Sequence, residues 1–321
     1  MNQFKVKISH AVLTEPLINT PYIDEILVKA SVEAESSAFS CRYLAGTIVE
    51  KGISARKFEQ GQPVLACLPL ECTLGIKELY KKTILVDEKY LIPLKPDTDL
   101  KKAAALSAVA VKAYTALFER GKFVKDETVM IIGGANNTGL LISQLVAKIG
   151  GKVLLFANSI EELNFLNKVE NSINAKIYLL NNEELTDTVR EETLGLGVDV
   201  LIDLRESHTT EEKRKTLECL SVNGRWIVSD NSIEIHAPET KQLFYRNATI
   251  SFLFEEAYSI FGIDFGKTLA MIEDAVERLN EKKFTIEIRE EIEEVAELEA
   301  LVKGEELSLL GKLGATLANL S

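Results

Sequence analysis

The chain has 321 residues, of which 46% are hydrophobic and 27% are charged, and its formal net charge is −12. This length predicts two domains, and the composition is typical of an ordinary globular protein. The acidic balance argues against a nucleic-acid surface, because phosphate backbones are bound by clustered basic side chains.

The first nine residues are polar and alternating, so we expect no signal peptide. No stretch approaches the roughly 18 apolar residues of a transmembrane segment. The four cysteines are sparse and irregularly spaced. We therefore expect a cytoplasmic protein with free thiols at Cys41, Cys67, Cys72 and Cys219.

Short strands separated by Gly and Pro are predicted in the first hundred residues, at 26–28, 46–49, 64–70 and 83–94. This spacing is typical of an all-β barrel or sandwich. Residues 102–120 are rich in Ala and Leu and predict a helix.

After Lys122, predicted strands alternate with predicted helices. The strands are 128–132, 152–157, 177–180, 198–202 and 225–229, and the helices are 139–149, 160–168, 183–193 and 210–220. Such alternation implies right-handed crossovers and a parallel sheet covered on both faces. The sequence therefore predicts an α/β fold with a doubly wound, Rossmann-type nucleotide-binding sheet.

Beyond this sheet we predict a strand from Ala248 to Phe254 and a long helix over 266–282. Acidic residues crowd 287–299, and we expect them to form the wet side of a helix. A last helix and strand end near Leu317.

The most specific local signal is an apolar strand that runs through a glycine turn into a helix. Little side chain is tolerated in such a turn when backbone N–H groups approach a pyrophosphate. The candidate cofactor-binding residues are Gly133, Gly134, Ala135, Asn136, Asn137, Thr138 and Gly139. Gly133 and Gly134 allow the tight exit from the strand, and Gly139 allows close packing of the helix. Asn136 and Asn137 project side chains where approach should be closest. A turn that only connects strand to helix remains an alternative.

The end of the second Rossmann strand decides the type of cofactor. An acid there holds the ribose 2′-OH of NAD, and a base accepts the 2′-phosphate of NADP. The strand tip carries neither an acid nor a base. Asn158 and Ser159 are candidates for ribose contact, and they serve equally well as the N-cap of the next helix.

The sequence contains no motif for a zinc site or a hydrolase. Cys67 and Cys72 are five apart without a second pair, and His10, His208 and His236 are scattered, so no zinc site is expected. No G-x-S-x-G elbow indicates a hydrolase. We assign no catalytic residue, because nothing places a partner beside any histidine.

Several stretches together resemble the quinone oxidoreductase branch of the medium-chain dehydrogenase/reductase superfamily. They are KAYTALF at 112–118, GLGVDVLID at 195–203, GRWIV at 224–228 and GKL at 311–313. The match extends over nearly the whole chain, with further similar segments at 67–71, 223–226 and 247–253.

The resemblance implies a zinc-independent oxidoreductase fold in which a Rossmann domain spans 100–282. Both chain ends, 1–99 and 283–321, are then expected to form a shortened GroES-like, β-rich domain, with the nucleotide cleft between the two. It implies NADP(H) or NAD(H) as the cofactor where one is retained. It also implies a homodimer through the strand from Ala248 to Phe254, and membership of a larger cytoplasmic assembly associated with endosomes.

The chain departs from this branch at four places around the expected cleft. The family's A-x-G-G-V-G turn has two central glycines, and this chain carries Asn136 and Asn137 at those two positions. The residue that usually contacts the 2′-phosphate is replaced by Glu162. A usual Gly-Gly pair is replaced by Arg205, Glu206 and Ser207. Too little chain lies between residues 34 and 43 for the usual substrate-lining loop.

These departures favour a degenerate nucleotide site in a weakly catalytic or non-catalytic dimeric binding subunit. The alternative is a working NAD(P)H-dependent quinone or enone reductase, since hydride transfer needs only a cofactor oriented beside its substrate. That alternative requires the side chains of Asn136 and Asn137 to turn outward.

Overall fold

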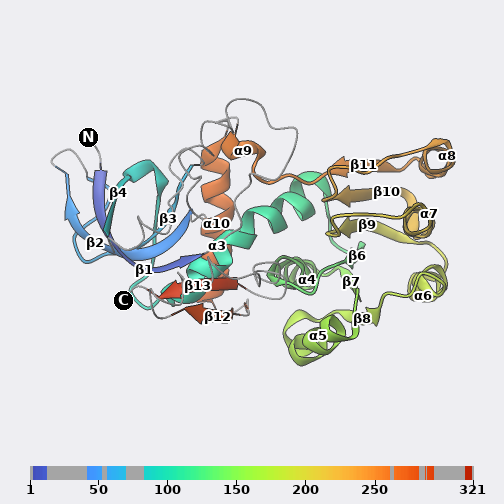
Figure 1. Ribbon diagram of the computed structural model, residues 1–321, viewed down its shortest axis with the longest axis horizontal. Coiled ribbons are helices and arrows are strands. Elements are labelled where there is room, and N and C mark those ends of the chain that lie inside the picture. Colours follow the sequence, from blue (N-terminus) through green and yellow to red (C-terminus); the bar gives the residue numbers. More distant parts are fainter. Residues whose placement is uncertain are drawn as a thin grey trace, which may run out of the picture. The chain divides into compact units, whose positions relative to one another are not determined.

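The computed structural model describes residues 3–12, 42–52, 56–69, 83–260, 264–281, 286, 288–292 and 315–319. The chain divides into two compact units, one made of residues 1–111 with 256–321 and the other of residues 112–255. Each unit has a sheet of its own (Figure 1). The domain bounds expected from the sequence, near residues 99 and 283, stay a prediction.

The sheet of the first unit is built around β1 (Gln3–Val12), which runs antiparallel to β2, β4 and β13. Among the described residues its other strands are β2 (Tyr43–Lys51), β3 (Pro63–Cys67), β4 (Thr83–Asp87), β5 (Leu91–Pro93), β12 (Ile288–Ile292) and β13 (Ala315–Asn319). Because β13 pairs with β1, the two ends of the chain lie in one sheet.

The strands predicted at 46–49 and 64–70 are confirmed as β2 and β3, and the run 83–94 divides into β4 and β5 around a short 3₁₀ turn. The helix expected over 287–299 is wrong at its start, where Ile288–Ile292 forms β12. This strand pairs in parallel with β13, and a distant partner strand of this kind overrides local preference. The predicted strand 26–28, the remainder of 287–299 and the predicted last helix lie outside the described residues.

Two more of the predicted helices are confirmed; the first crosses the boundary between the two units after residue 111, and the second lies in the first unit. α3 (Leu100–Tyr114) continues into a π-helical turn at Thr115–Arg120, and α10 (Phe265–Asn280) follows the short α9 (Ala257–Ile260). The buried residues of α10 recur every three or four positions, the spacing of an amphipathic helix: Thr268, Met271, Ile272, Ala275, Val276 and Leu279.

The second unit contains a parallel sheet in the order β11-β10-β9-β6-β7-β8. Its described strands are β6 (Thr128–Ile132), β7 (Lys152–Ala157), β8 (Lys176–Leu179), β9 (Val198–Asp203), β10 (Leu220–Val228) and β11 (Thr249–Phe252). Numbered along the chain within this unit, the order is 3-2-1-4-5-6, which is the doubly wound arrangement. The order reverses between β6 and β9.

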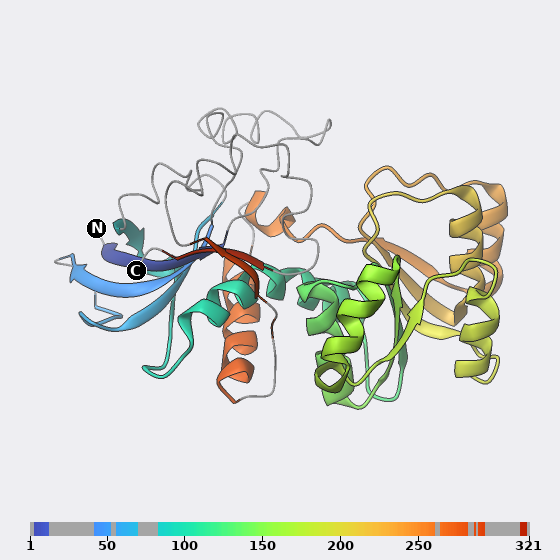
Figure 2. The same cartoon turned by 60° about the horizontal axis from the view of Figure 1, so that its bottom comes forward.

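Helices cover both faces of this sheet (Figures 1 and 2). α4 (Asn137–Ile149) and α5 (Ile160–Ile173) pack together, and α6 (Leu185–Glu192), α7 (Thr210–Glu218) and α8 (Ala237–Arg246) pack together. The predicted strands and helices are confirmed to within a few residues. The largest deviations are at β10, which begins at Leu220 rather than 225 and is irregular between Leu220 and Arg225, and at α5, which ends at Ile173 rather than 168.

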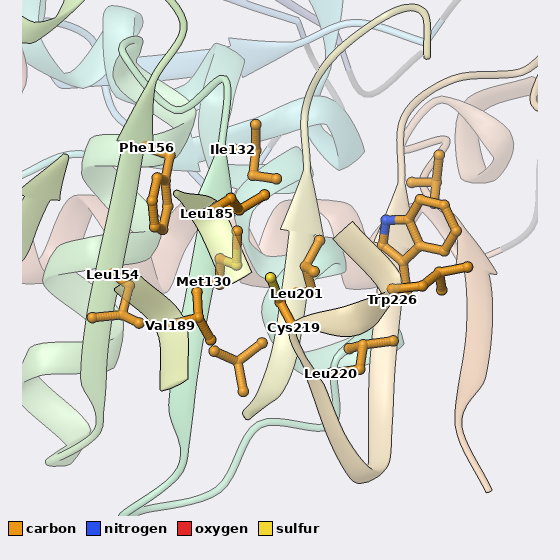
Figure 3. Packing of buried hydrophobic residues seen from close by; sticks show 13 residues of the cluster. Met130, Ile132, Leu154, Phe156, Leu185, Val189, Leu201, Cys219, Leu220 and Trp226 are labelled. Atoms are coloured by element: carbon orange, nitrogen blue, oxygen red, sulfur yellow. The ribbon is translucent and has the colours of Figure 1, made fainter. Parts of the chain in front are cut away.

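The core of this unit explains why its strands read as continuous apolar runs. Val129 to Ile132 are all fully buried, as expected for a strand covered on both faces. Figure 3 shows part of the cluster under α6 and α7, which includes Met130, Leu201 and the chain's single tryptophan, Trp226. This rigid core fixes the position of the loops at the carboxyl ends of the strands.

Candidate nucleotide site

The turn between β6 and α4 keeps the backbone that its glycines predict. Gly133 has a φ of +71°, which L side chains rarely adopt. A Cβ on Gly139 would lie 2.2 Å from the carbonyl oxygen of Gly134, and a Cβ on Gly134 would lie 2.6 Å from Leu155 Cδ1. The close approach of helix to strand is therefore confirmed, and it depends on these glycines.

Asn136 closes this turn with its own side chain. It is the N-cap of α4, where its Oδ1 accepts the backbone N–H of Gly139 at 3.1 Å. Its Nδ2 donates to the carbonyl of Gly133 at 3.0 Å. The side chain therefore folds over the turn, and it occupies one of the helix N–H groups that are otherwise free for an anion.

The other candidates of the turn are largely covered. Gly134, Ala135, Asn137, Thr138 and Gly139 are all buried, whereas Gly133 and Asn136 are partly exposed. The candidate residues lie together because they are consecutive in the chain. Asn137 is only 4% exposed.

Asn158 and Ser159 at the tip of β7 are held by local hydrogen bonds. Ser159 is the N-cap of α5, and its Oγ accepts the N–H of Glu162 at 3.2 Å. The Glu162 carboxylate in turn accepts the backbone N–H of Asn158 at 2.7 Å. The capping interpretation of Ser159 is thus confirmed, and the Glu162 carboxylate lies at the tip of β7.

A buried charged cluster at the carboxyl ends of β9 and β10 was not predicted. Arg205 donates to Asp203 through Nε at 2.8 Å and Nη2 at 2.6 Å. His208 lies 2.8 Å from Asp203 through Nε2 and 2.8 Å from Asp230 through Nδ1. At most 9% of any of these four side chains is exposed.

The hydrogen bonds in this cluster keep its carboxylates ionised. Burial alone would raise the pKa of Asp203, but the bonds from Arg205 and His208 outweigh it, so the pKa lies below its ordinary value. Burial would also raise the pKa of Asp230, but hydrogen bonds from His208 and Ser232 outweigh it and lower this pKa. Burial would lower the pKa of His208, but its bonds to both carboxylates raise it. Both ring nitrogens can donate only in the protonated imidazole.

Sequence reasoning missed this cluster because His208 and Asp230 are 22 positions apart. One signal was available. Asp203 is the last residue of β9, and Asp230 follows β10 by two residues. Neighbouring parallel strands bring their carboxyl ends to the same edge, so the two acids could have been predicted to be close.

The described residues contain neither a reactive cysteine thiol nor a cluster of metal-binding side chains. Cys67 and Cys219 are buried free thiols, and burial raises the pKa of each to about 12, so both are poor nucleophiles. Cys41 and Cys72 lie outside the described residues. In the same described ranges, no three His, Cys, Asp or Glu side chains are grouped to hold a metal ion.

No protein-family model matches the chain. Its sequence is similar to quinone oxidoreductase-like protein 1 of Mus musculus, with 29% identity over 252 residues, which are 74% of this chain and 71% of that protein. It also matches much larger polyketide synthases, of whose length the matched part spans only 6% to 9%.

Solved structures agree in fold. An alcohol dehydrogenase superfamily protein from Novosphingobium aromaticivorans is 18% identical and has a TM-score of 0.74, covering 100% of this chain and 92% of its own. A 2-haloacrylate reductase is 17% identical and has a TM-score of 0.70, covering 99% and 91%. The chain therefore has the fold of the medium-chain dehydrogenase/reductase superfamily, and its sequence is similar to that of a quinone oxidoreductase-like protein.

Proposed function

We propose that this chain is a quinone oxidoreductase-like protein with a degenerate nucleotide site, and that it acts as a weakly catalytic or non-catalytic dimeric binding subunit. The contact that carries the proposal is the bond from the Gly139 N–H to Asn136 Oδ1, 3.1 Å long. A pyrophosphate at this helix N-terminus would have to displace the asparagine side chain. Its binding would therefore lose one backbone hydrogen bond and meet added bulk.

The charge at the tip of β7 supports the same proposal. Glu162 lies at the end where a basic residue would hold the 2′-phosphate of NADP, and it is anchored by the Asn158 N–H. A phosphate there would meet a carboxylate, which is destabilising at short range. If any dinucleotide is retained, NAD(H) is favoured over NADP(H).

A homodimer through β11 is part of this proposal. Among the described strands β11 pairs only with β10, so its other edge is open. Phe252 and Phe254 beside this edge are 55% and 41% exposed. An open apolar edge strand tends to associate, and a two-fold axis would pair it with the same strand of a second copy.

The proposal places the protein in the cytoplasm, in a larger assembly associated with endosomes. It is the family resemblance that supports this placement. In the described part of the chain, no helix has the length and apolar character needed to cross a membrane. Imaging of a fluorescent fusion beside an endosomal marker tests it, and a signal that never overlaps with the marker contradicts it.

A working NAD(P)H-dependent quinone or enone reductase is the second candidate. Its support is the backbone of the turn, which retains the positive φ of Gly133 and the close approach of Gly134 to Gly139. One of the relatives in fold is named as a 2-haloacrylate reductase, and hydride transfer needs no metal or nucleophile from the protein.

Titration with NADH and NADPH, followed by a quinone reduction assay, separates the two candidates. The degenerate site predicts no saturable binding at micromolar concentrations of either nucleotide, and at most weak turnover. Micromolar binding with turnover supports the reductase.

A further inference from the structure

The position where an open α/β sheet binds its ligand can be located from strand order. The order of the second unit's sheet reverses between β6 and β9, whose last residues, Ile132 and Asp203, pair with each other. Ligands of such sheets lie outside the carboxyl ends of the strands at this reversal. The residues that follow the two strands, Gly133 and Leu204, therefore border the expected position.

Arg205 lies in contact with Gly133, the residue that follows β6. The backbone nitrogen of Arg205 lies 3.4 Å, and its Cγ 3.5 Å, from the position of a Cβ on Gly133. The arginine side chain is only 9% exposed. Arg205 therefore lies at contact distance from the space that the missing side chain of Gly133 leaves.

The guanidinium is anchored rather than free to swing aside. It binds both carboxylate oxygens of Asp203 and contacts Thr216 Oγ1 at 3.2 Å, with Glu212 at 3.6 Å. A bidentate arginine–carboxylate pair combines strength with fixed geometry. Since Asp203 is wholly buried, removing its partner would leave a buried charge with less compensation.

His208 braces the same carboxylate from the other side. As an imidazolium it joins Asp203 on β9 to Asp230 beyond β10. The carboxylates of Asp203, Asp230 and Glu212 surround the two cations, so the positive charge of Arg205 is already neutralised. It offers little attraction for an incoming phosphate.

We infer that Arg205 is an internal occupant of the dinucleotide position, and that it closes the site independently of Asn136. This inference rests on the proposed degenerate site. It identifies Arg205 as a second residue that blocks the site, at the point where the strand order reverses. Opening the glycine turn alone leaves the affinity for NADH low, and tighter binding also requires the removal of Arg205.

A comparison of variants tests the inference with NADH as the probe, because Glu162 disfavours the additional phosphate of NADPH. Asn136→Gly with Asn137→Gly opens the turn, and Arg205→Gly is then added. We expect the dissociation constant for NADH to fall at least tenfold when Arg205→Gly is added. An affinity that is the same with and without Arg205, or undetectable in both, overturns the inference.

Glu206→Gly, added to the same opened turn, is the matched control. It places a glycine in the same loop at an exposed position and keeps the guanidinium. It should leave the NADH affinity unchanged. An equal gain from Glu206→Gly assigns the effect to loop flexibility and contradicts a role for Arg205.

The fluorescence of Trp226 reports whether the variants fold around the cluster of Asp203, Arg205, His208 and Asp230. Trp226 packs edge to face against His208, with ring centroids 6.2 Å apart, so its emission reports on this region. If Arg205→Gly does not fold, Asp203→Asn with Arg205→Gly removes the unpaired charge and makes the same prediction. Micromolar NADH binding and turnover by the wild type would overturn the proposed function, whereas the effect of Arg205 on affinity is judged separately.

Discussion

Nε2 of His208 lies 2.8 Å from Oδ2 of Asp203, and both side chains are fully buried. The opposite ring nitrogen is equally close to Asp230. The groups that act on this imidazole include these two carboxylates, the guanidinium of Arg205, the carboxylate of Glu212 and the ring of Trp226. The two carboxylates outweigh burial and the nearby guanidinium, so the pKa of His208 lies above its ordinary value.

The free energy of unfolding should therefore decrease on the alkaline side. A raised pKa in the folded state contributes stability that is complete below the ordinary histidine pKa of about 6.5, and that is lost as the pH rises through the folded value. His208→Gln should remove this dependence. Urea unfolding from about pH 6 to about pH 9, followed by Trp226 fluorescence, measures it.

His236→Gln provides the control, because the His236 side chain is more than half exposed. It should retain the alkaline loss of the wild type. A wild-type stability that is constant over the range, or a loss that persists in His208→Gln, contradicts the imidazolium bridge.

Gly139→Ala should destabilise the second unit by about 3 kcal/mol, as overpacking against a rigid backbone does. The added Cβ would lie 2.2 Å from the Gly134 carbonyl oxygen, so β6 and α4 would have to separate. Gly266→Ala in α10 meets no atom within 4 Å and should stabilise by up to about 1 kcal/mol. Thermal and urea unfolding of both variants check the pair, and equal effects would contradict the close approach.

Glu192 supports a cluster at the other end of the sheet. Hydrogen bonds from Lys152, Lys176 and Tyr178 hold its pKa at about 2. A lowered pKa contributes stability above the ordinary glutamate value of about 4.3, and this stability is lost as the pH falls toward the folded value. Glu192→Gln should cost about 1 kcal/mol at neutral pH, since the group is partly exposed.

The matched variant for this cluster is Glu191→Gln, at the exposed neighbouring position. It should unfold at the same urea concentration as the wild type at neutral pH. If Glu192→Gln does the same, and its stability keeps the full acid dependence, the cluster does not stabilise the fold.

The proposed dimer makes a prediction about oligomeric state. Phe252→Lys places a charge on the exposed side chain of the edge strand β11, and it should convert a dimer to a monomer in sedimentation analysis. Leu196→Lys changes an equally apolar residue that is 77% exposed but lies before β9, and it should leave the dimer intact. A wild type that sediments as a monomer contradicts the proposal.

Most of the second unit could be predicted because its signals are local. The apolar strand ending at Ile132 and the glycines at 133, 134 and 139 specify strand, turn and helix within one short segment. Ser159 was recognised as a possible cap because serine is favoured at that position. In such cases neighbouring residues supply both the pattern and the partner.

What the sequence did not reveal depends on distant partners. Ile288–Ile292 forms a strand because β13, near the end of the chain, pairs with it. His208 meets Asp203 and Asp230 only when two parallel strands align their ends. The direction of the Asn136 side chain is likewise decided by hydrogen bonds to the folded turn, which a residue type alone does not fix.

The most direct test of the degenerate site is a titration of the purified wild-type protein with NADH and NADPH by fluorescence. Because Asn136 occupies the Gly139 N–H and Arg205 contacts Gly133, we expect no saturable binding of either nucleotide at micromolar concentrations. A micromolar dissociation constant for either nucleotide, accompanied by quinone reduction, would contradict it.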